Sequence, residues 1–201
     1  MLNSKLLSGV RSFRKDHSGT VAVETVIIFP ALLFVLFAMM NIFDAYRAKS
    51  TTEKAAFAVS DMLSRETTSV NCDYLNGIHA VLEEMSTVRS SHSMTITHVY
   101  WSVNTNDYEL YWTRNQSCGA GVTAGEFEAM KGKLPQLVDG ESLLVVETSA
   151  TYAPPILAGW DGKRKEGSLE LSETESPLNM DIDTFVFSRP RFAPQLAWSN
   201  S

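Results

Sequence analysis

The sequence predicts an α+β fold: a long N-terminal transmembrane helix continues into an extracytoplasmic domain with a second helix and an antiparallel sheet of about four strands. Three observations predict it. Residues 19–43 form one long apolar run, the segments up to residue 89 have apolar residues at helical spacing, and the chain after residue 93 is rich in alternating β-branched and aromatic residues. We therefore expect a basic leader at 1–19, a membrane helix at 20–43 and one extracytoplasmic domain at 44–201.

The apolar run is long enough to span a bilayer. From Val21 to Phe43 there are 23 residues, which form about 34 Å of helix against a hydrocarbon thickness of about 30 Å. Residues 31–40 contain no polar side chain, whereas a helix buried in a soluble core normally has one polar face. A secretory signal peptide fits less well, because its apolar region is shorter and ends in a small-x-small cleavage site. We predict a retained transmembrane helix, with a buried soluble helix as the alternative.

Charge predicts the orientation and excludes one class of partner. Four basic residues precede the span and three follow it closely: Lys5, Arg11, Arg14 and Lys15 before, and Arg47, Lys49 and Lys54 after. This slight positive-inside bias predicts a cytoplasmic N-terminus and a periplasmic C-terminal domain in a bacterial inner membrane. The net charge is −6 and no basic stripe is present, which argues against nucleic-acid binding.

The chain after the span predicts two helices followed by strands. Residues 44–66 contain neither Gly nor Pro, so we expect the membrane helix to continue, with a separate amphipathic helix as the alternative. Residues 74–89 have apolar residues three and four apart, which predicts the second helix. Period-two segments then predict four strands, with a hairpin between the first two and a short helix at 125–134 before the third; the strands are 94–103, 108–114, 141–152 and 183–192.

Two groups of side chains in the domain are candidates for a role beyond the core: the aromatic residues of the hairpin and the two cysteines. The hairpin aromatics resemble a ligand platform, but we expect them to form cross-strand pairs that face a core; they are Trp101, Tyr108, Tyr111 and Trp112. Cys72 and Cys118 are the only cysteines. In an oxidising periplasm they would close a loop of about 46 residues and stabilise the domain by roughly 3–4 kcal/mol. Two separate buried thiols are the alternative.

Motifs for catalysis or cofactors are not found in the sequence. The four histidines lack metal-ligand spacing, no Gly-x-Ser-x-Gly elbow occurs, and the Gly-rich segment 116–125 lacks the lysine of a phosphate-binding loop. The acidic segment 172–183 does not match an EF-hand. We therefore predict no enzyme activity, no metal and no cofactor, although a triad assembled from distant residues stays an alternative.

The start of the apolar run resembles the class III signal of type IV pilins and pseudopilins. Gly19 follows the basic leader, and Glu24 is the fifth residue after it. The resemblance implies that a prepilin peptidase cleaves after Gly19, so that Thr20 becomes the new N-terminus. A lone carboxylate in an apolar helix gains from a cationic partner, and the amino group of a neighbouring subunit's Thr20 could supply it.

Within that superfamily the chain most resembles TadE/TadF-like minor pseudopilins of the tight-adherence (Flp) pilus system. The resemblance is carried by residues 19–25 (GTVAVET), by Pro30 and by the Leu/Phe-rich continuation. Major Flp pilins have Tyr where Thr25 stands and are much shorter than this chain, which has some 158 residues after Phe43. The resemblance implies pilus assembly and secretion for surface adherence. The implied partners are the prepilin peptidase, other Tad pilins and pseudopilins, the inner-membrane assembly platform and the membrane, and incorporation into a pilus is an open possibility.

Other interpretations stay open. Gly19 could merely punctuate the helix start, Glu24 could be a first-turn acid favoured by the helix dipole, and Pro30 could be a tolerated kink. The chain could also be an uncleaved, signal-anchored periplasmic sensor or ligand-binding protein, or a membrane-tethered hydrolase.

Overall fold

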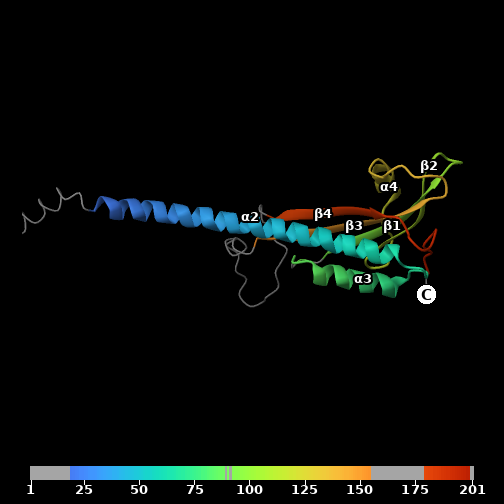
Figure 1. The fold of residues 1–201 in the computed structure, drawn as a ribbon, viewed down its shortest axis with the longest axis horizontal. Coiled ribbons are helices and arrows are strands. Elements are labelled where there is room, and N and C mark those ends of the chain that lie inside the picture. Colours follow the sequence, from blue (N-terminus) through green and yellow to red (C-terminus); the bar gives the residue numbers. More distant parts are fainter. Residues whose placement is uncertain (1–18, 89, 91, 155–178, 200–201) are drawn as a thin grey trace, which may run out of the picture. The chain divides into compact units, whose positions relative to one another are not determined.

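The structure, a computed structural model, describes residues 19–88, 90, 92–154 and 179–199. Within these residues the elements are, in order, α2 (Thr20–Ser64), α3 (Cys72–Met85), β1 (Ser93–Ser102), β2 (Asp107–Asn115), α4 (Ala124–Lys131), β3 (Ser142–Tyr152) and β4 (Met180–Ser188) (Figure 1). The chain divides into two compact units after Phe43. The predicted α+β class, with a long N-terminal apolar helix, a second helix and a four-stranded antiparallel sheet, is confirmed.

Helix α2 is continuous from the apolar run into the second unit, so the alternative of a separate amphipathic helix is wrong. Its 45 residues contain no glycine, and the residues after Phe43 place small and apolar side chains at helical spacing. Helix α3 begins at Cys72, earlier than predicted, because the Asn71 side chain caps it by accepting a hydrogen bond from the Tyr74 N–H. It ends at Met85, because Ser86 has extended backbone angles.

The four strands form one antiparallel sheet in the order β2-β1-β3-β4. The β1–β2 hairpin turns through Asn106, which has a φ of 47°, a left-handed conformation that asparagine tolerates. Strand β4 begins at Met180, three residues before the predicted start, because its register with β3 extends to the Tyr152–Met180 pair. The acidic segment 172–183 falls largely on residues 155–178, which lie outside the described residues.

The main core lies between one face of the sheet and the two long helices. Val59 and Leu63 of α2, and Leu75 and Leu82 of α3, are fully buried against the apolar side chains of β1 and β3. On the other face, α4 packs Phe127 and Met130 onto the same two strands. Residues two apart on a strand share a face, so alternation along β1 and β3 supplies both cores.

The C-terminal segment closes the main core. Leu196 is 1% exposed, and its backbone carbonyl accepts hydrogen bonds from His98 Nδ1–H at 3.1 Å and from Trp112 Nε1–H at 2.7 Å. The segment also pairs with the loop after α2, because the Val70 N–H donates to the carbonyl of Ala197. Two residues of the sheet and one loop therefore hold a chain end that has no regular secondary structure.

The hairpin aromatics confirm the core prediction only in part. Tyr108 and Trp112 are buried and Trp101 packs onto the α4 cluster, but Tyr111 is 45% exposed. The reason is a register shift opposite His98: this residue pairs with Trp112 and the next residue of β1 pairs with Leu110. Tyr111 is thus the extra residue of a β-bulge, and a bulge redirects the side chain that it adds.

Candidate functional site

The predicted processing site lies at the start of α2. The helix begins at Thr20, directly after Gly19, and the Val23 N–H donates to the Gly19 carbonyl at 3.1 Å. A Cβ added at Gly19 would meet nothing within 4 Å. No steric contact with the described residues therefore requires glycine at this position.

Glu24 is a carboxylate in the first turns of this helix. It is exposed among apolar side chains, and none of the hydrogen bonds or ion pairs among the described residues involves it. The neighbouring Thr25 is different, because its hydroxyl donates to the Val21 carbonyl at 2.8 Å within the helix. Thr25 thus carries its polar group at little cost in an apolar surrounding, whereas Glu24 would need a partner from outside the helix.

Pro30 lies in the interior of α2. It has no N–H, so the carbonyl four residues earlier, that of Val26, loses its intrahelical hydrogen bond. The helix nevertheless continues to Ser64. The Val26 carbonyl and the Glu24 carboxylate are therefore two polar groups of α2 that lack a hydrogen-bond partner within the helix.

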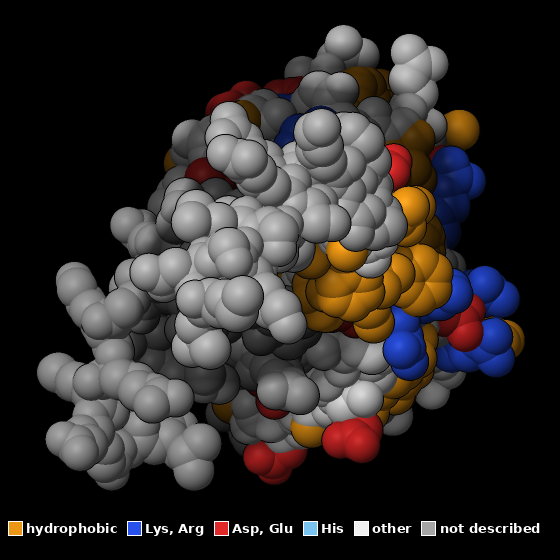
Figure 2. All heavy atoms as spheres, turned by 90° about the vertical axis from the view of Figure 1, so that its left-hand side faces the viewer, with side chains coloured by type: hydrophobic (Ala, Val, Ile, Leu, Met, Phe, Trp, Pro, Cys, Tyr) orange, Lys and Arg blue, Asp and Glu red, His pale blue; other side chains and the backbone are white. Residues whose placement is uncertain are grey.

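Most side chains of residues 21–43 are apolar and exposed. They include Val26, Phe29, Phe34 and Met39, with Phe34 at 75% exposure. In Figure 2, which faces the left-hand side of Figure 1, hydrophobic side chains gather near the centre of the view. Among the described residues, α2 is the one helix that is long and apolar enough to cross a membrane. The first unit therefore offers a helical surface suited to lipid or to other apolar helices.

At the start of the second unit, the turn of α2 that follows Phe43 contacts the sheet. The Tyr152 hydroxyl donates to Asp44 Oδ2 at 2.7 Å, and Ala45 and Ala48 pack beside it against Ala150 and Ile182. Burial and the Asp44 carboxylate raise the pKa of Tyr152 to about 12. Sequence patterns did not point to this contact, because its two residues are 108 positions apart.

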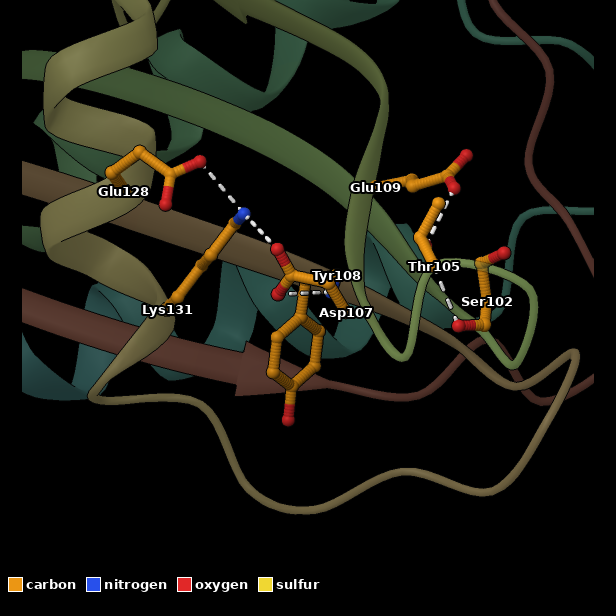
Figure 3. Close-up of polar contacts among 7 residues, drawn as sticks. All are labelled: Ser102, Thr105, Asp107, Tyr108, Glu109, Glu128 and Lys131. Atoms are coloured by element: carbon orange, nitrogen blue, oxygen red, sulfur yellow. Dashed lines mark hydrogen bonds and ion pairs between the residues drawn. The ribbon is translucent and has the colours of Figure 1, made fainter.

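A second polar cluster joins the hairpin to α4 (Figure 3). Lys131 Nζ lies 2.5 Å from Asp107 Oδ2 and 2.7 Å from Glu128 Oε1. The hydrogen bond from Lys131 lowers the pKa of Asp107, and the same bond raises the pKa of Lys131. Both groups therefore stay charged at neutral pH, which suits a structural ion pair better than proton transfer.

The predicted disulfide is present. Cys72, the first residue of α3, is bonded to Cys118 in the loop after β2. It links the helical layer to the edge strand of the sheet. Among the described residues, no group of three or more His, Cys, Asp or Glu side chains is arranged to hold a metal ion.

Comparison with known proteins finds one similarity, which lies in helix α2. Residues 19–61 match the model of a family described as TadE-like protein. The match begins at Gly19, includes Glu24 and Pro30, and ends within α2, so it confirms the resemblance found in the sequence and covers none of the sheet. No curated protein and no solved structure matches the chain.

Proposed function

We propose that this chain is a minor pseudopilin of the tight-adherence (Flp) pilus system, processed by a prepilin peptidase after Gly19 and taking part in pilus assembly and secretion for surface adherence. The observation that carries the proposal is the TadE-like match at residues 19–61. The match supports involvement in the Tad pilus system and implies association with other pilus components. It also favours a non-enzymatic role.

The membrane arrangement follows from the same segment. Residues 20–43 are the assembly helix in the bacterial inner membrane, the leader at 1–19 is cytoplasmic, and residues 44–201 form the periplasmic domain. The partners are the prepilin peptidase, other Tad pilins and pseudopilins, and the inner-membrane assembly platform. The disulfide between Cys72 and Cys118 supports an oxidising compartment for the domain.

Glu24 has the assembly role in this proposal. A carboxylate without a partner in an apolar helix is costly in lipid. Cleavage after Gly19 frees the amino group of Thr20 in every subunit, and an ion pair between this group and the Glu24 of a neighbour would offset the cost. Such a pair forms only between subunits in register, so it favours ordered helix packing.

The first test is the N-terminal sequence and intact mass of the native chain extracted from membranes. We expect a chain that begins at Thr20, and an uncut chain when Gly19 is replaced by Leu. Because Gly19 makes no close contact, the Gly19→Leu variant should keep the fold. A wild-type chain that begins at Met1 in cells with an active prepilin peptidase would contradict the proposal and favour the signal-anchored sensor.

The second test separates assembly from folding. We expect Glu24→Gln to abolish surface pili while the periplasmic domain keeps its thermal stability. Glu53→Gln is the matched control, because Glu53 lies on the same helix in the second unit and has only a long contact with Lys49. Normal piliation with Glu24→Gln would remove Glu24 from the assembly mechanism.

A further inference from the structure

The first turns of the second unit display basic and aromatic side chains. Tyr46 is 71% exposed, and Arg47 and Lys54 are exposed as well. Neither cation has an ion pair with the described residues. Lys49 has one contact, with Glu53 at 4.0 Å, and both side chains are largely in solvent, so this pair contributes little. We call Tyr46, Arg47, Lys49 and Lys54 the basic collar.

Two acidic residues, Asp44 and Glu53, lie on the same helical turns as the collar, and the sheet engages the carboxylate of Asp44. Asp44 accepts the hydrogen bond from Tyr152 at 2.7 Å and is half-buried, and Glu53 faces Lys49. The carboxylate of Asp44 is therefore directed toward the sheet, whereas the cations of the collar stay in solvent. The exposed charge of these helical turns is positive.

Distances along the helix place the collar at the height of lipid headgroups. At ~1.5 Å per residue, Tyr46 and Arg47 stand about 5–6 Å beyond the end of the apolar run at Phe43. The polar layer on each side of a bilayer is roughly 5–8 Å thick, so both residues lie within it. Lys49 stands about 9 Å beyond Phe43 along the helix, and its flexible side chain can extend back to the headgroup layer. Lys54 stands within one to two Debye lengths of this layer, so its charge still acts on the headgroups.

The collar differs in charge from the rest of the domain. After Phe43 the sequence has 13 Lys and Arg residues against 21 Asp and Glu residues. A domain with this excess of acid is repelled by an anionic surface. Within residues 47–54 three cations stand against one carboxylate, that of Glu53, next to the apolar run; the other basic run, 163–165, lies outside the described residues. Tyrosine beside cations at the end of a span is also the composition of an interfacial anchor.

We propose that the basic collar binds the headgroup phosphates of anionic phospholipids in the outer leaflet of the inner membrane. This inference rests on the proposed membrane span, but not on cleavage or on a role in pili. Arg47 holds a phosphate directly, Tyr46 lies at the headgroup level, and Lys49 and Lys54 add attraction across the layer. The bound lipid sets the depth at which the domain sits on the membrane.

The test uses the full chain purified from membranes and placed in nanodiscs of phosphatidylcholine with phosphatidylglycerol. Native mass spectrometry counts the lipids of each kind that stay bound after mild release. We expect enrichment of phosphatidylglycerol over its share in the disc. Arg47→Gln/Lys49→Gln/Lys54→Gln should lower this enrichment about fivefold or more, since each cation near the surface contributes roughly that factor, and 0.5 M NaCl should lower it for the wild type.

The matched control is Arg65→Gln/Arg189→Gln/Arg191→Gln, which removes the same charge elsewhere in the domain and should keep the enrichment. Equal enrichment in the wild type and the collar variant would overturn the lipid proposal and leave the proposed function intact. A wild-type chain that does not enter discs of phosphatidylcholine alone would overturn both, because the collar then has no membrane beside it.

Discussion

Removing the Tyr152 hydroxyl tests how the start of the second unit is held. Tyr152 is 7% exposed, and its hydroxyl donates to the Asp44 carboxylate at 2.7 Å. The change Tyr152→Phe deletes this one bond and keeps the ring, which packs with Ala45 and Ile182. A hydrogen bond to a charged group contributes about 1.5–3 kcal/mol, and we expect about 1.5 kcal/mol because the half-buried Asp44 can regain water.

The measurement is urea unfolding of wild type, Tyr152→Phe, Asp44→Ala and the double variant. The double-mutant cycle should give a coupling energy of about 1.5 kcal/mol between the two side chains. Alkaline pH provides a second check. The pKa of Tyr152 is raised in the folded state to about 12, so its stabilisation is complete below pH ~10 and declines as the pH rises from there toward 12. Tyr152→Phe should lack this decline.

Two results would refute the reasoning. A coupling energy near zero would show that the hydrogen bond does not hold the helix to the sheet. An unchanged alkaline decline in Tyr152→Phe would show that another group produces it.

Three further predictions concern the second unit. Reducing the disulfide, or Cys72→Ser/Cys118→Ser, should lower the free energy of unfolding by about 4 kcal/mol, because the bond closes a loop across a separation of 46 residues; equal urea midpoints with and without reductant would contradict this. Burial lowers the pKa of His98 to about 4. The contribution of neutral His98 to the free energy of unfolding is therefore complete above pH ~6.5, and up to about 3 kcal/mol of it is lost as the pH falls to 4. In urea titrations at successive pH values, His98→Gln should show a smaller fall of the free energy of unfolding between pH ~6.5 and about 4. Leu196→Ala should cost about 2–4 kcal/mol in the same assay, because the 1% exposed side chain leaves a cavity under the C-terminal segment; a loss below 1 kcal/mol would mean that this segment does not complete the core.

The lipid proposal and the Tyr152 contact are linked through one residue. If Asp44 were released from Tyr152, its carboxylate would stand next to Arg47 at the level of the headgroups. We therefore expect the Tyr152→Phe variant to show a smaller enrichment of anionic lipid than the wild type in the nanodisc measurement, although the change is remote from the collar in sequence.

The sequence by itself determined the properties that depend on composition and local spacing. An apolar run of this length favours a helix in lipid or in a protein core. The first half of α2, and its suitability as a candidate membrane span, could therefore be predicted from residues 20–43 alone. Periods of 3.6 and 2 distinguished α3 from the strands, because side chains on one face recur every three to four residues in a helix and every two in a strand. With two cysteines, a single pairing was possible.

Only the tertiary structure decided which distant groups meet. Tyr111 faces solvent because a bulge in β2 shifts the register, and periodicity cannot show a bulge. The carbonyl of Leu196 lies between His98 and Trp112, and Asp44 meets Tyr152, through contacts that span about a hundred residues. Such contacts depend on how layers pack, and packing is set by the whole core, so no local pattern contains them.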